Sequence, residues 1–341
     1  NWYDFTNLNA YILHWQVVGD HGKVIADGTR RVDAAPHATV EVTLGAVRLP
    51  SDVREAYLNL SWTPVDAAPF INTDYEVAYD QFVLSGNKNY RTPETKLSGK
   101  VEMNIDPATG ALRSYIYNRK ELLFSPVTLS LYRPVTDNDN REKVGGAKAW
   151  KKAGLDQLTQ RALTVKTSTR DGELDIQTHF VPDTTVISSL ARVGFTFEMP
   201  DTYSQVSYLG RGDHETYMDR NQSGKIGIYH TDVERMFHYY VRPQATGNRT
   251  DVRWMQLADE AGEGLAFRSD TSFQFSVVPF TDENLDAATH INQLRREGVI
   301  TVHLDAAQAG VGTATCGPGV LPQYRVPVQD YTFRFTIRPL K

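Results

Sequence analysis

The hydrophobic pattern of this chain is dominated by strict alternation of apolar and polar residues. The clearest examples are the segments 39–44, 55–62, 173–180 and 331–337. Successive side chains of a β-strand point to opposite faces, so this alternation indicates half-buried antiparallel strands. Helical spacing occurs only in 147–154 and in 282–297, where Thr281 is a candidate N-cap. The pattern therefore predicts an all-β fold.

A polar stretch near residue 90 divides the chain into two units. Residues 1–84 contain about six short predicted strands joined by turns, which is typical of an immunoglobulin-like sandwich that lacks one edge strand at its start. The stretch 85–98 is polar, contains Gly86, Asn87, Lys88, Asn89 and Pro93, and has the composition of a linker. We therefore predict an immunoglobulin-like β-sandwich at 1–86 and, since strands follow without any internal repeat, one large antiparallel β-sandwich at 87–341.

Composition and charge indicate a soluble globular protein and exclude several classes. Apolar residues make up 40% of the 341 residues and the net charge is −5, which excludes a disordered chain and gives no basic surface for nucleic acid. No apolar run approaches the roughly 20 residues of a membrane helix.

The chain begins at Asn1 without a signal-peptide pattern, which indicates a processed start or a piece of a longer protein. The single cysteine, Cys316, excludes internal disulfides and leaves the compartment open, and the scattered histidines show no metal-ligand spacing.

Four polar segments of the second unit carry recognisable motifs. They are RPVTDND at 133–139, GRGDHETYMDR at 210–220, QATGNRTDVRW at 244–254 and GVGTATCGP at 310–318. These segments resemble, in the same order, motifs of the C-terminal domains of bacterial β-galactosidases of glycoside hydrolase family 2. The first unit resembles the preceding domain of that family more loosely, around Leu13, His14 and Trp15. The resemblance covers essentially the whole chain and is most specific in the second unit.

The resemblance implies a fold and an activity for the longer protein. The last two domains of the family are an immunoglobulin-like sandwich and a large antiparallel supersandwich similar to galactose mutarotases. Family enzymes hydrolyse terminal β-D-galactosides with two glutamates on a central (β/α)8 barrel, and this sequence lacks the alternating strand and helix pattern of such a barrel. We therefore expect no catalytic residue in this chain, which would support the barrel and line the rim of its sugar pocket.

The resemblance also implies partners and cofactors. The partners would be the upstream domains of the same polypeptide, the β-galactoside substrate of the full-length enzyme and further copies in a homo-oligomer, with no nucleic acid and no membrane. Family enzymes use Mg²⁺ and Na⁺ in the part that precedes these domains, so we expect no cofactor and no metal site here. A bacterial cytoplasm and a periplasm are equally compatible with the resemblance.

Nine residues are placed by the resemblance at the rim of the sugar pocket: Arg133, Asp137, Asn138, Asp139, Arg211, Glu215, Tyr217, Arg220 and Cys316. In one interpretation of the segment 210–220, Glu215, Tyr217 and Arg220 face the sugar. In the other, Arg211 and Arg220 form bidentate ion pairs with the two acidic residues of the same segment, which are Glu215 and Asp219. That arrangement would fix a long loop and need no contact with a ligand.

The segment 133–141 and Cys316 leave two further alternatives. The matching loop of the family is mobile and lies beside the active site, which implies that 133–141 closes over bound sugar. The alternative is a surface turn with an Asx cap ahead of a short helix. Some relatives carry a sugar-stacking tryptophan where this chain has Cys316, whose thiol lacks a broad apolar face. The alternative for Cys316 is a small buried residue in a tight glycine turn.

Two other functions stay open at the level of the sequence. A free-standing mutarotase would need a general acid and a general base in one cleft, with His179 and Glu215 as candidates. A carbohydrate-binding module would need exposed aromatic side chains, with Trp2, Trp62 or Trp150 as candidates.

Overall fold

A computed structural model describes residues 1–341 apart from 87–98, 144, 158–162, 171–172, 181–186 and 341. The chain forms two compact units, Asn1–Lys88 with Lys225–Ile228 and Asn89–Gly224 with Tyr229–Lys341. The predicted boundary after residue 86 falls at the edge of the undescribed segment 87–98. Both units consist of antiparallel sheets with short helices, which confirms the predicted all-β class.

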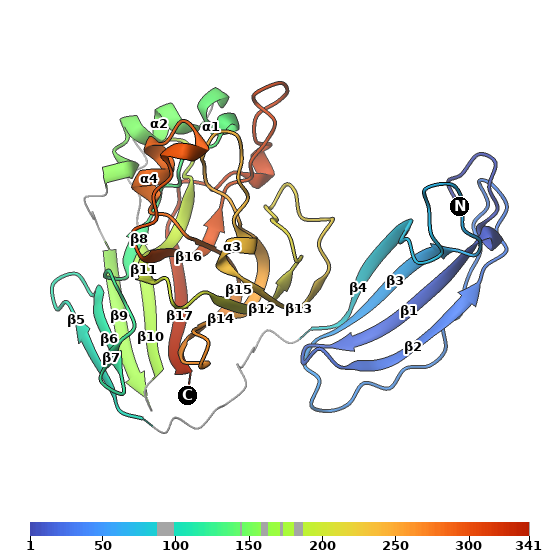
Figure 1. Ribbon diagram of the computed structural model, residues 1–341, viewed down its shortest axis with the longest axis horizontal. Helices are drawn as coiled ribbons and strands as arrows, with labels where there is room; N and C mark the ends of the chain where they lie inside the picture. Colours follow the sequence, from blue (N-terminus) through green and yellow to red (C-terminus); the bar gives the residue numbers. More distant parts are fainter. Residues whose placement is uncertain (87–98, 144, 158–162, 171–172, 181–186, 341) are drawn as a thin grey trace. The chain divides into compact units, whose positions relative to one another are not determined.

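The first unit is a four-stranded antiparallel sheet. Its strands are β1 Tyr11–Gly19, β2 Val24–Arg31, β3 Ala56–Pro64 and β4 Ala78–Ser85, preceded by the 3₁₀ turn η1 Leu8–Ala10. Their order is β2-β1-β3-β4 (Figure 1). Alternate side chains of β1 are buried, because Leu13, Trp15 and Val17 point to one face. The predicted strand at 55–62 is confirmed as the greater part of β3.

The segment 39–44 is not a strand, so the prediction of about six strands is wrong for the described part of the first unit, where four form. Instead, Val42 and Leu44 pack as irregular chain against the apolar face of the sheet, next to Leu13. Alternation marks the residues that are buried, and burial alone does not require hydrogen bonds to a neighbouring strand.

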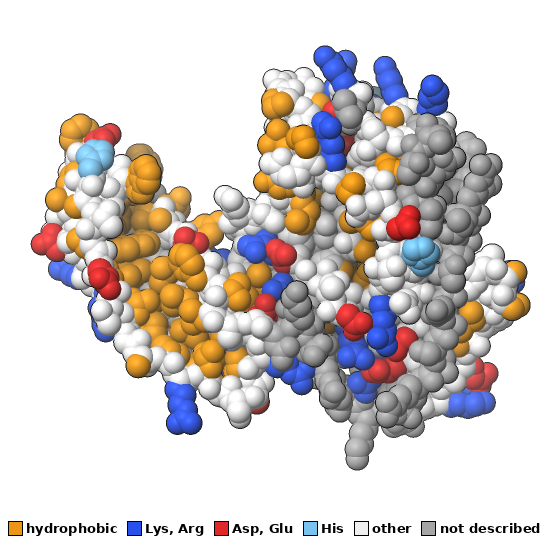
Figure 2. Space-filling model, turned by 180° about the vertical axis from the view of Figure 1, so that it is seen from behind, with side chains coloured by type: hydrophobic (Ala, Val, Ile, Leu, Met, Phe, Trp, Pro, Cys, Tyr) orange, Lys and Arg blue, Asp and Glu red, His pale blue; other side chains and the backbone are white. Residues whose placement is uncertain are grey.

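Apolar side chains are also exposed on the surface of the first unit (Figure 2). The edge strand β4 carries exposed Phe82, Val83 and Leu84, and successive residues of a strand point to opposite faces. Both faces of this edge strand therefore present apolar surface to solvent.

Ten strands form the main antiparallel sheet of the second unit: β8 Thr128–Ser130, β9 Leu163–Arg170, β10 Glu173–Phe180, β11 Arg192–Pro200, β12 Gln205–Arg211, β13 Ile226–Asp232, β14 Arg249–Ala258, β15 Gly264–Val278, β16 Val299–Gln308 and β17 Tyr331–Leu340. The main order is β13-β12-β14-β15-β16-β11-β8, while β17 joins β15 to β10 and β10 pairs with β9. A smaller sheet contains β5 Val101–Ile105, β6 Leu112–Tyr117 and β7 Lys120–Glu121. The predicted strand at 173–180 is β10, and the one at 331–337 lies within β17.

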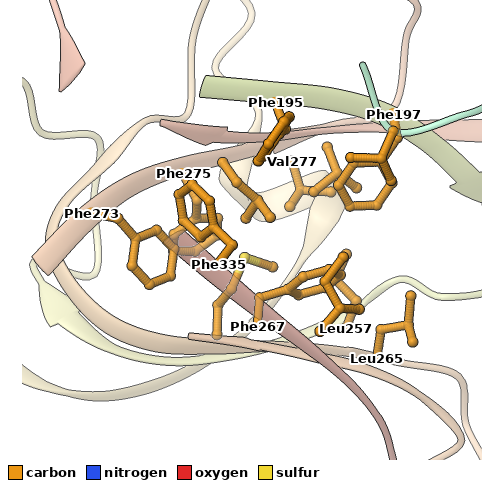
Figure 3. Close-up of a cluster of buried hydrophobic side chains, with 14 of the residues drawn as sticks. Phe195, Phe197, Leu257, Leu265, Phe267, Phe273, Phe275, Val277 and Phe335 are labelled. Atoms are coloured by element: carbon orange, nitrogen blue, oxygen red, sulfur yellow. The ribbon is translucent and has the colours of Figure 1, made fainter. Parts of the chain in front are cut away.

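The long strand β15 connects two layers of the main sheet. Its first part, up to Ser269, pairs with β17, and its second part, from Gln274, pairs with β16. The core lies between these layers, where Figure 3 shows side chains of β11, β15 and β17 pointing toward one another. The rings of Phe195 and Phe335 lie 5.9 Å apart, and those of Phe273 and Phe335 lie 5.3 Å apart, both edge to face. Aromatic packing of this kind joins the layers.

Short helices gather at one end of the second unit (Figure 1). Those at this end are α1 Asp137–Arg141, α2 Ala147–Lys152 and α4 Asp282–Ala287. Asp286 of α4 accepts hydrogen bonds from the Tyr132 hydroxyl at 3.0 Å and the Lys151 ammonium at 2.8 Å, which ties these segments together. The remaining helical elements are α3 Val233–Met236, η2 Leu155–Gln157, η3 Ile291–Gln293 and η4 Pro322–Tyr324.

Two helices were predicted from the sequence, and they differ in outcome. The helix at 147–154 is confirmed as α2. Thr281 caps α4 as predicted, because its hydroxyl accepts from the amide of Asn284 at 3.2 Å. The predicted length of 282–297 is wrong, since α4 ends at Ala287. Leu285 is its buried residue, so the helix lacks the continuous apolar face that would support further turns.

Candidate functional site

The segment 309–320, which we call the 309–320 turn, is anchored at its start by Arg133. The side chain of Arg133 is 0% exposed. Its Nη1 donates to the carbonyl of Ala309 at 2.7 Å, and its Nη2 donates to the carbonyl of Gly310 at 2.9 Å. Nε and Nη2 also donate to the carboxylate of Asp139 at 3.1 and 2.8 Å. The planar guanidinium thereby links two motifs that are far apart in sequence.

The loop 133–141 is held in place by the capping of α1. The hydroxyl of Thr136 accepts from the Asp139 amide at 3.0 Å, and the Asp139 carboxylate accepts from the Thr136 amide at 3.0 Å. This reciprocal arrangement is a capping box. The structure therefore shows a capped turn ahead of a short helix, which was the alternative to a closing loop. The cap is a threonine, where the sequence predicted an Asp or Asn. Closure of the loop over a sugar stays a prediction.

Two side chains near α1 hold the backbone of the 309–320 turn. Asn138 donates to the carbonyl of Gly312 at 2.8 Å and accepts from the amide of Thr315 at 3.0 Å. The carboxylate of Glu142 accepts from the amide of Val320 at 2.7 Å. Sequence reasoning missed Glu142, because a carboxylate that binds a distant backbone amide has no local sequence signal.

Asp219 holds the same turn from the 210–220 motif. Its carboxylate accepts from the amides of Val311 at 3.0 Å and Gly312 at 2.8 Å. A Cβ atom on Gly310 would lie 2.5 Å from this carboxylate, and Gly312 has a positive φ of 57°. Glycine is required at both positions, by the close approach at one and by the left-handed backbone at the other. The predicted pairing of Asp219 with an arginine of its own segment is wrong.

Cys316 lies in this turn and is exposed. Its amide and that of Gly317 donate to the carbonyl of Thr313 at 3.0 and 2.7 Å. The prediction of a tight glycine turn is confirmed, whereas the prediction that the residue is buried is wrong. The turn thus presents a small thiol to solvent from a well-anchored backbone.

Glu215 is the most heavily hydrogen-bonded carboxylate of the 210–220 motif. It accepts from the Tyr240 hydroxyl at 2.6 Å, the Thr246 hydroxyl at 2.7 Å and the Gly247 amide at 2.7 Å, and it pairs with Arg220. Burial disfavours the charged carboxylate, but these hydrogen bonds and the positive charge of Arg220 outweigh burial and lower the pKa of Glu215. Glu215 is therefore an ionised structural centre that joins two motifs.

The two arginines of the 210–220 motif have different partners. Arg220 pairs with Glu215, as the structural interpretation predicted. Arg211 pairs instead with Asp251, at 2.5 Å between Nε and Oδ2, so its predicted pairing within the motif is wrong. Arg211 is the last residue of β12 and lies opposite Thr250 of β14, which brings the neighbouring Asp251 within reach. Sheet register selected this partner.

A buried polar network lies beneath the anchored loops. Gln308 accepts from Arg133 at 3.3 Å and donates to Asn248 at 3.2 Å and Asp305 at 2.9 Å. Asn248 donates in turn to Gln274 at 2.9 Å. Connected buried networks of this kind rigidify the segments that they join. Here they join the 133–139 and 244–254 motifs to the strand that enters the 309–320 turn.

The nine predicted rim residues differ in their access to solvent. Arg133, Asp139 and Tyr217 are buried within this chain, so they support the loops and present no surface to a ligand in this arrangement. The others reach the surface fully or in part: Asp137, Asn138, Arg211, Glu215, Arg220 and Cys316. Contact between these six residues and a sugar stays a prediction.

The structure does not bring together the pair of residues that a mutarotase would need. A hollow of about 400 Å³ opens beside Glu215 and is also lined by His238 and Tyr240. His179 lies on β10, is not among the residues that line the hollow, and makes a 3.1 Å hydrogen bond with Thr332. The carboxylate of Glu215 is also surrounded by internal donors, which makes it a poor general base.

The three tryptophans predicted as a sugar platform occupy different environments. Trp150 is 2% exposed and its Nε1 donates to the carbonyl of Ser189 at 3.0 Å, so its prediction as a platform is wrong. Trp62 is partly buried against the core of the first unit. Trp2 is 97% exposed.

Among the residues that the structure describes, no group of three or more His, Cys, Asp and Glu side chains could hold a metal ion. In the same part of the chain, no helix combines the length and the apolar character needed to cross a membrane.

Comparison with known proteins matches both units. Residues 97–337 match the family described as "Beta galactosidase small chain", and residues 1–85 match "Beta-galactosidase, domain 4". A β-galactosidase of Priestia megaterium is 28% identical and is matched over 98% of this chain and 37% of its own length. A β-galactosidase of Actinobacillus pleuropneumoniae is 22% identical, over 99% of this chain and 37% of its own. The β-galactosidase of Kluyveromyces lactis is 26% identical and is matched over 94% of this chain and 36% of its own length.

Among solved structures, a glycoside hydrolase family 97 enzyme from Pseudoalteromonas is similar over 71% of this chain and 34% of that chain, with 8% identity and a TM-score of 0.30. A likeness at that level carries no argument about this chain. The chain spans about 37% of the length of the first two relatives, so most of each relative lies outside the matched region.

Proposed function

Because this chain belongs to the β-galactosidase small-chain family, we propose that it is the non-catalytic C-terminal region of a β-galactosidase. In the full-length protein it would support the catalytic domain and line the rim of the pocket that holds a terminal β-D-galactoside. The observation that carries this proposal is the convergence of the motif loops on the 309–320 turn. Arg133, Asn138 and Asp219 hold one exposed turn in a fixed position.

The acidic side chains of the 210–220 motif are already occupied by internal donors. A retaining glycosidase needs two carboxyl groups about 5–5.5 Å apart, one free to attack the sugar and one free to donate a proton. Glu215 is surrounded by donors on several sides, and Asp219 binds two backbone amides. The glutamates that cleave the glycosidic bond, together with bound Mg²⁺ and Na⁺, would then belong to the domains that precede this chain.

The apolar edge strand of the first unit supports a packing partner. Phe82, Val83 and Leu84 of β4 are exposed, and an uncovered apolar edge strand is an aggregation hazard that proteins usually shield. Upstream domains of the same polypeptide would cover it, since most of each relative lies outside the region that this chain matches. Assembly into a homo-oligomer stays a prediction.

The proposal can be tested by comparing the full-length β-galactosidase with the isolated 341-residue chain on a chromogenic β-galactoside. We expect no turnover above the blank by the isolated chain. In the full-length enzyme, Asn138→Ala should lower kcat/KM by about tenfold with an unchanged Tm, because its contacts position an exposed turn rather than the core. Asn140→Ala in the same helix is the matched control and should leave kcat/KM unchanged.

Two outcomes would contradict the proposal. Turnover by the isolated chain would show that it carries its own catalytic groups. Equal kcat/KM for Asn138→Ala and Asn140→Ala would show that the position of the 309–320 turn does not affect the sugar pocket.

A further inference from the structure

The hollow of about 400 Å³ beside Glu215 contains groups, among them Arg235 and His238, that the proposed function does not use. Three segments of the second unit line it: the loop that follows β12, the end of α3 with the residues after it, and the start of β14. Its volume lies in the range of about 300–1,000 Å³ that is typical of small-molecule sites. The chemistry of its free side chains therefore indicates what it could hold.

The acidic groups of the hollow are engaged within the protein. Glu215 accepts from Tyr240 and from other internal donors. The carboxylate of Asp213 lies 2.8 Å from Nδ1 of His214, and Nε2 of the same ring lies 2.8 Å from the Ser223 hydroxyl. Both oxygens of Glu215 and one oxygen of Asp213 are thus occupied before any ligand arrives.

Two guanidinium groups of the hollow keep free donors. Arg220 contacts Glu215 through Nη2 and also makes a hydrogen bond with the Tyr240 side chain, and its own side chain is 49% exposed. Arg235 contacts Asp232 through Nε at 3.3 Å, and its side chain is 80% exposed. The other nitrogens of both groups can therefore donate to a ligand in a forked geometry.

His238 adds ring nitrogens to the hollow, and Arg249 adds a positive charge. The ring of His238 is exposed and packs against Tyr240 at 4.3 Å, and its nitrogens have no hydrogen-bond partner among the described residues. Arg249 is buried, and it donates to the Tyr208 hydroxyl and to backbone carbonyls rather than to a carboxylate. Its charge therefore adds positive potential to the wall of the hollow.

We propose that this hollow binds a phosphate group, either free or as the monoester of a small molecule, through Arg220, Arg235 and His238. Three guanidinium groups and two carboxylates line the hollow. Because the carboxylates already have partners within the protein, the groups left for a ligand are mainly N–H donors. A phosphate monoester carries a charge of about −1.5 to −2 and three acceptor oxygens, which suit such donors. A neutral sugar needs acceptors as well as donors, and the occupied carboxylates supply few.

Calorimetric titration of the 341-residue chain with inorganic phosphate at low ionic strength tests the proposal. We expect saturable binding that weakens as NaCl is added. Arg235→Gln and His238→Gln should each weaken it by about five- to tenfold, a loss that corresponds to one charge-assisted contact. Both side chains are exposed, so the variants should keep the wild-type Tm. Arg295→Gln removes an exposed arginine outside the hollow and should bind phosphate as the wild type does.

Separate titrations with galactose 6-phosphate and with galactose identify the source of the phosphate. Tighter binding of galactose 6-phosphate than of inorganic phosphate would identify a monoester ligand, and equal affinities would identify phosphate alone. Three results would overturn the proposal: no saturable phosphate binding, an equal loss in Arg295→Gln, or binding of galactose as tight as that of phosphate. None of these results bears on the role of the 309–320 turn.

Discussion

Replacement of Arg133 by alanine removes the cation at the centre of the anchored loops. The side chains of Arg133 and Asp139 are 0% and 3% exposed, so the substitution leaves a carboxylate buried without its cation. The variant also loses the hydrogen bonds to Gln308 and to the carbonyls of Ala309 and Gly310. Loss of one partner of a buried pair costs about 3–5 kcal/mol, because the remaining charge is uncompensated.

Thermal and urea unfolding of the 341-residue chain measure this loss. For a unit of this size, about 1 kcal/mol shifts Tm by roughly 2–4 °C, so Arg133→Ala should lower Tm by roughly 6–20 °C. Arg334 on β17 is the matched control, because it pairs with Asp175 while its side chain is 46% exposed. Arg334→Ala should cost less than about 1 kcal/mol.

A double-mutant cycle isolates the pair itself. Arg133→Met, Asp139→Asn and the double variant keep similar volumes, and asparagine can still accept from the amide of Thr136. We expect a coupling energy of about 2–3 kcal/mol between the two positions. Additive effects, or a loss below about 1 kcal/mol for Arg133→Ala, would refute the reasoning, since such a value is typical of an exposed ion pair.

Three further predictions concern a cap, a glycine and a carboxylate. Thr281→Ala removes the N-cap of α4 and should cost about 1 kcal/mol in urea unfolding, with Thr281→Ser retaining most of the wild-type stability. Gly312 has a positive φ, and the Cβ atom of Gly312→Ala would lie 2.8 Å from the amide nitrogen of Val320. Gly154 also has a positive φ but has open space around it, so Gly312→Ala should lower Tm by more than Gly154→Ala does. Internal hydrogen bonds hold the folded-state pKa of Glu215 below its ordinary value. Its contribution to stability is therefore complete above the pKa of the unfolded chain and is lost as the pH falls through the folded-state pKa. Glu215→Gln should flatten the acid limb of a plot of stability against pH, and parallel acid limbs for the two proteins would contradict this.

Strand positions and motif identity could be predicted from the sequence because they depend on neighbouring residues. The alternation at 173–180 predicted β10, and Thr281 was recognised as a cap because its hydroxyl acts three residues ahead. The same reasoning failed at 39–44, where burial occurs without strand pairing. It also overestimated the helix at 282–297, because the buried residue Leu285 is not followed by a continuous apolar face.

The candidate site could be predicted only in part. The motifs pointed to the segments that converge on the 309–320 turn and to the pairing of Arg220 with Glu215, which are five positions apart. They did not show that Arg133 and Tyr217 are buried, because burial depends on segments that pack over them. Nor did they identify Glu142, whose only sign in the sequence is an acidic residue after a short helix.

By itself, the sequence determined the all-β class, the resemblance to a family and the segments that carry its motifs, since these follow from local patterns of residues. Tertiary structure alone decided how those segments meet. Asp219 reaches the amide of Val311 across 92 positions, and Arg133 reaches the carbonyl of Ala309 across 176. Sheet register set the partner of Arg211 in the same way. Contacts between residues so far apart in sequence depend on how the whole chain packs, and the spacing of neighbouring residues does not determine which distant residues meet.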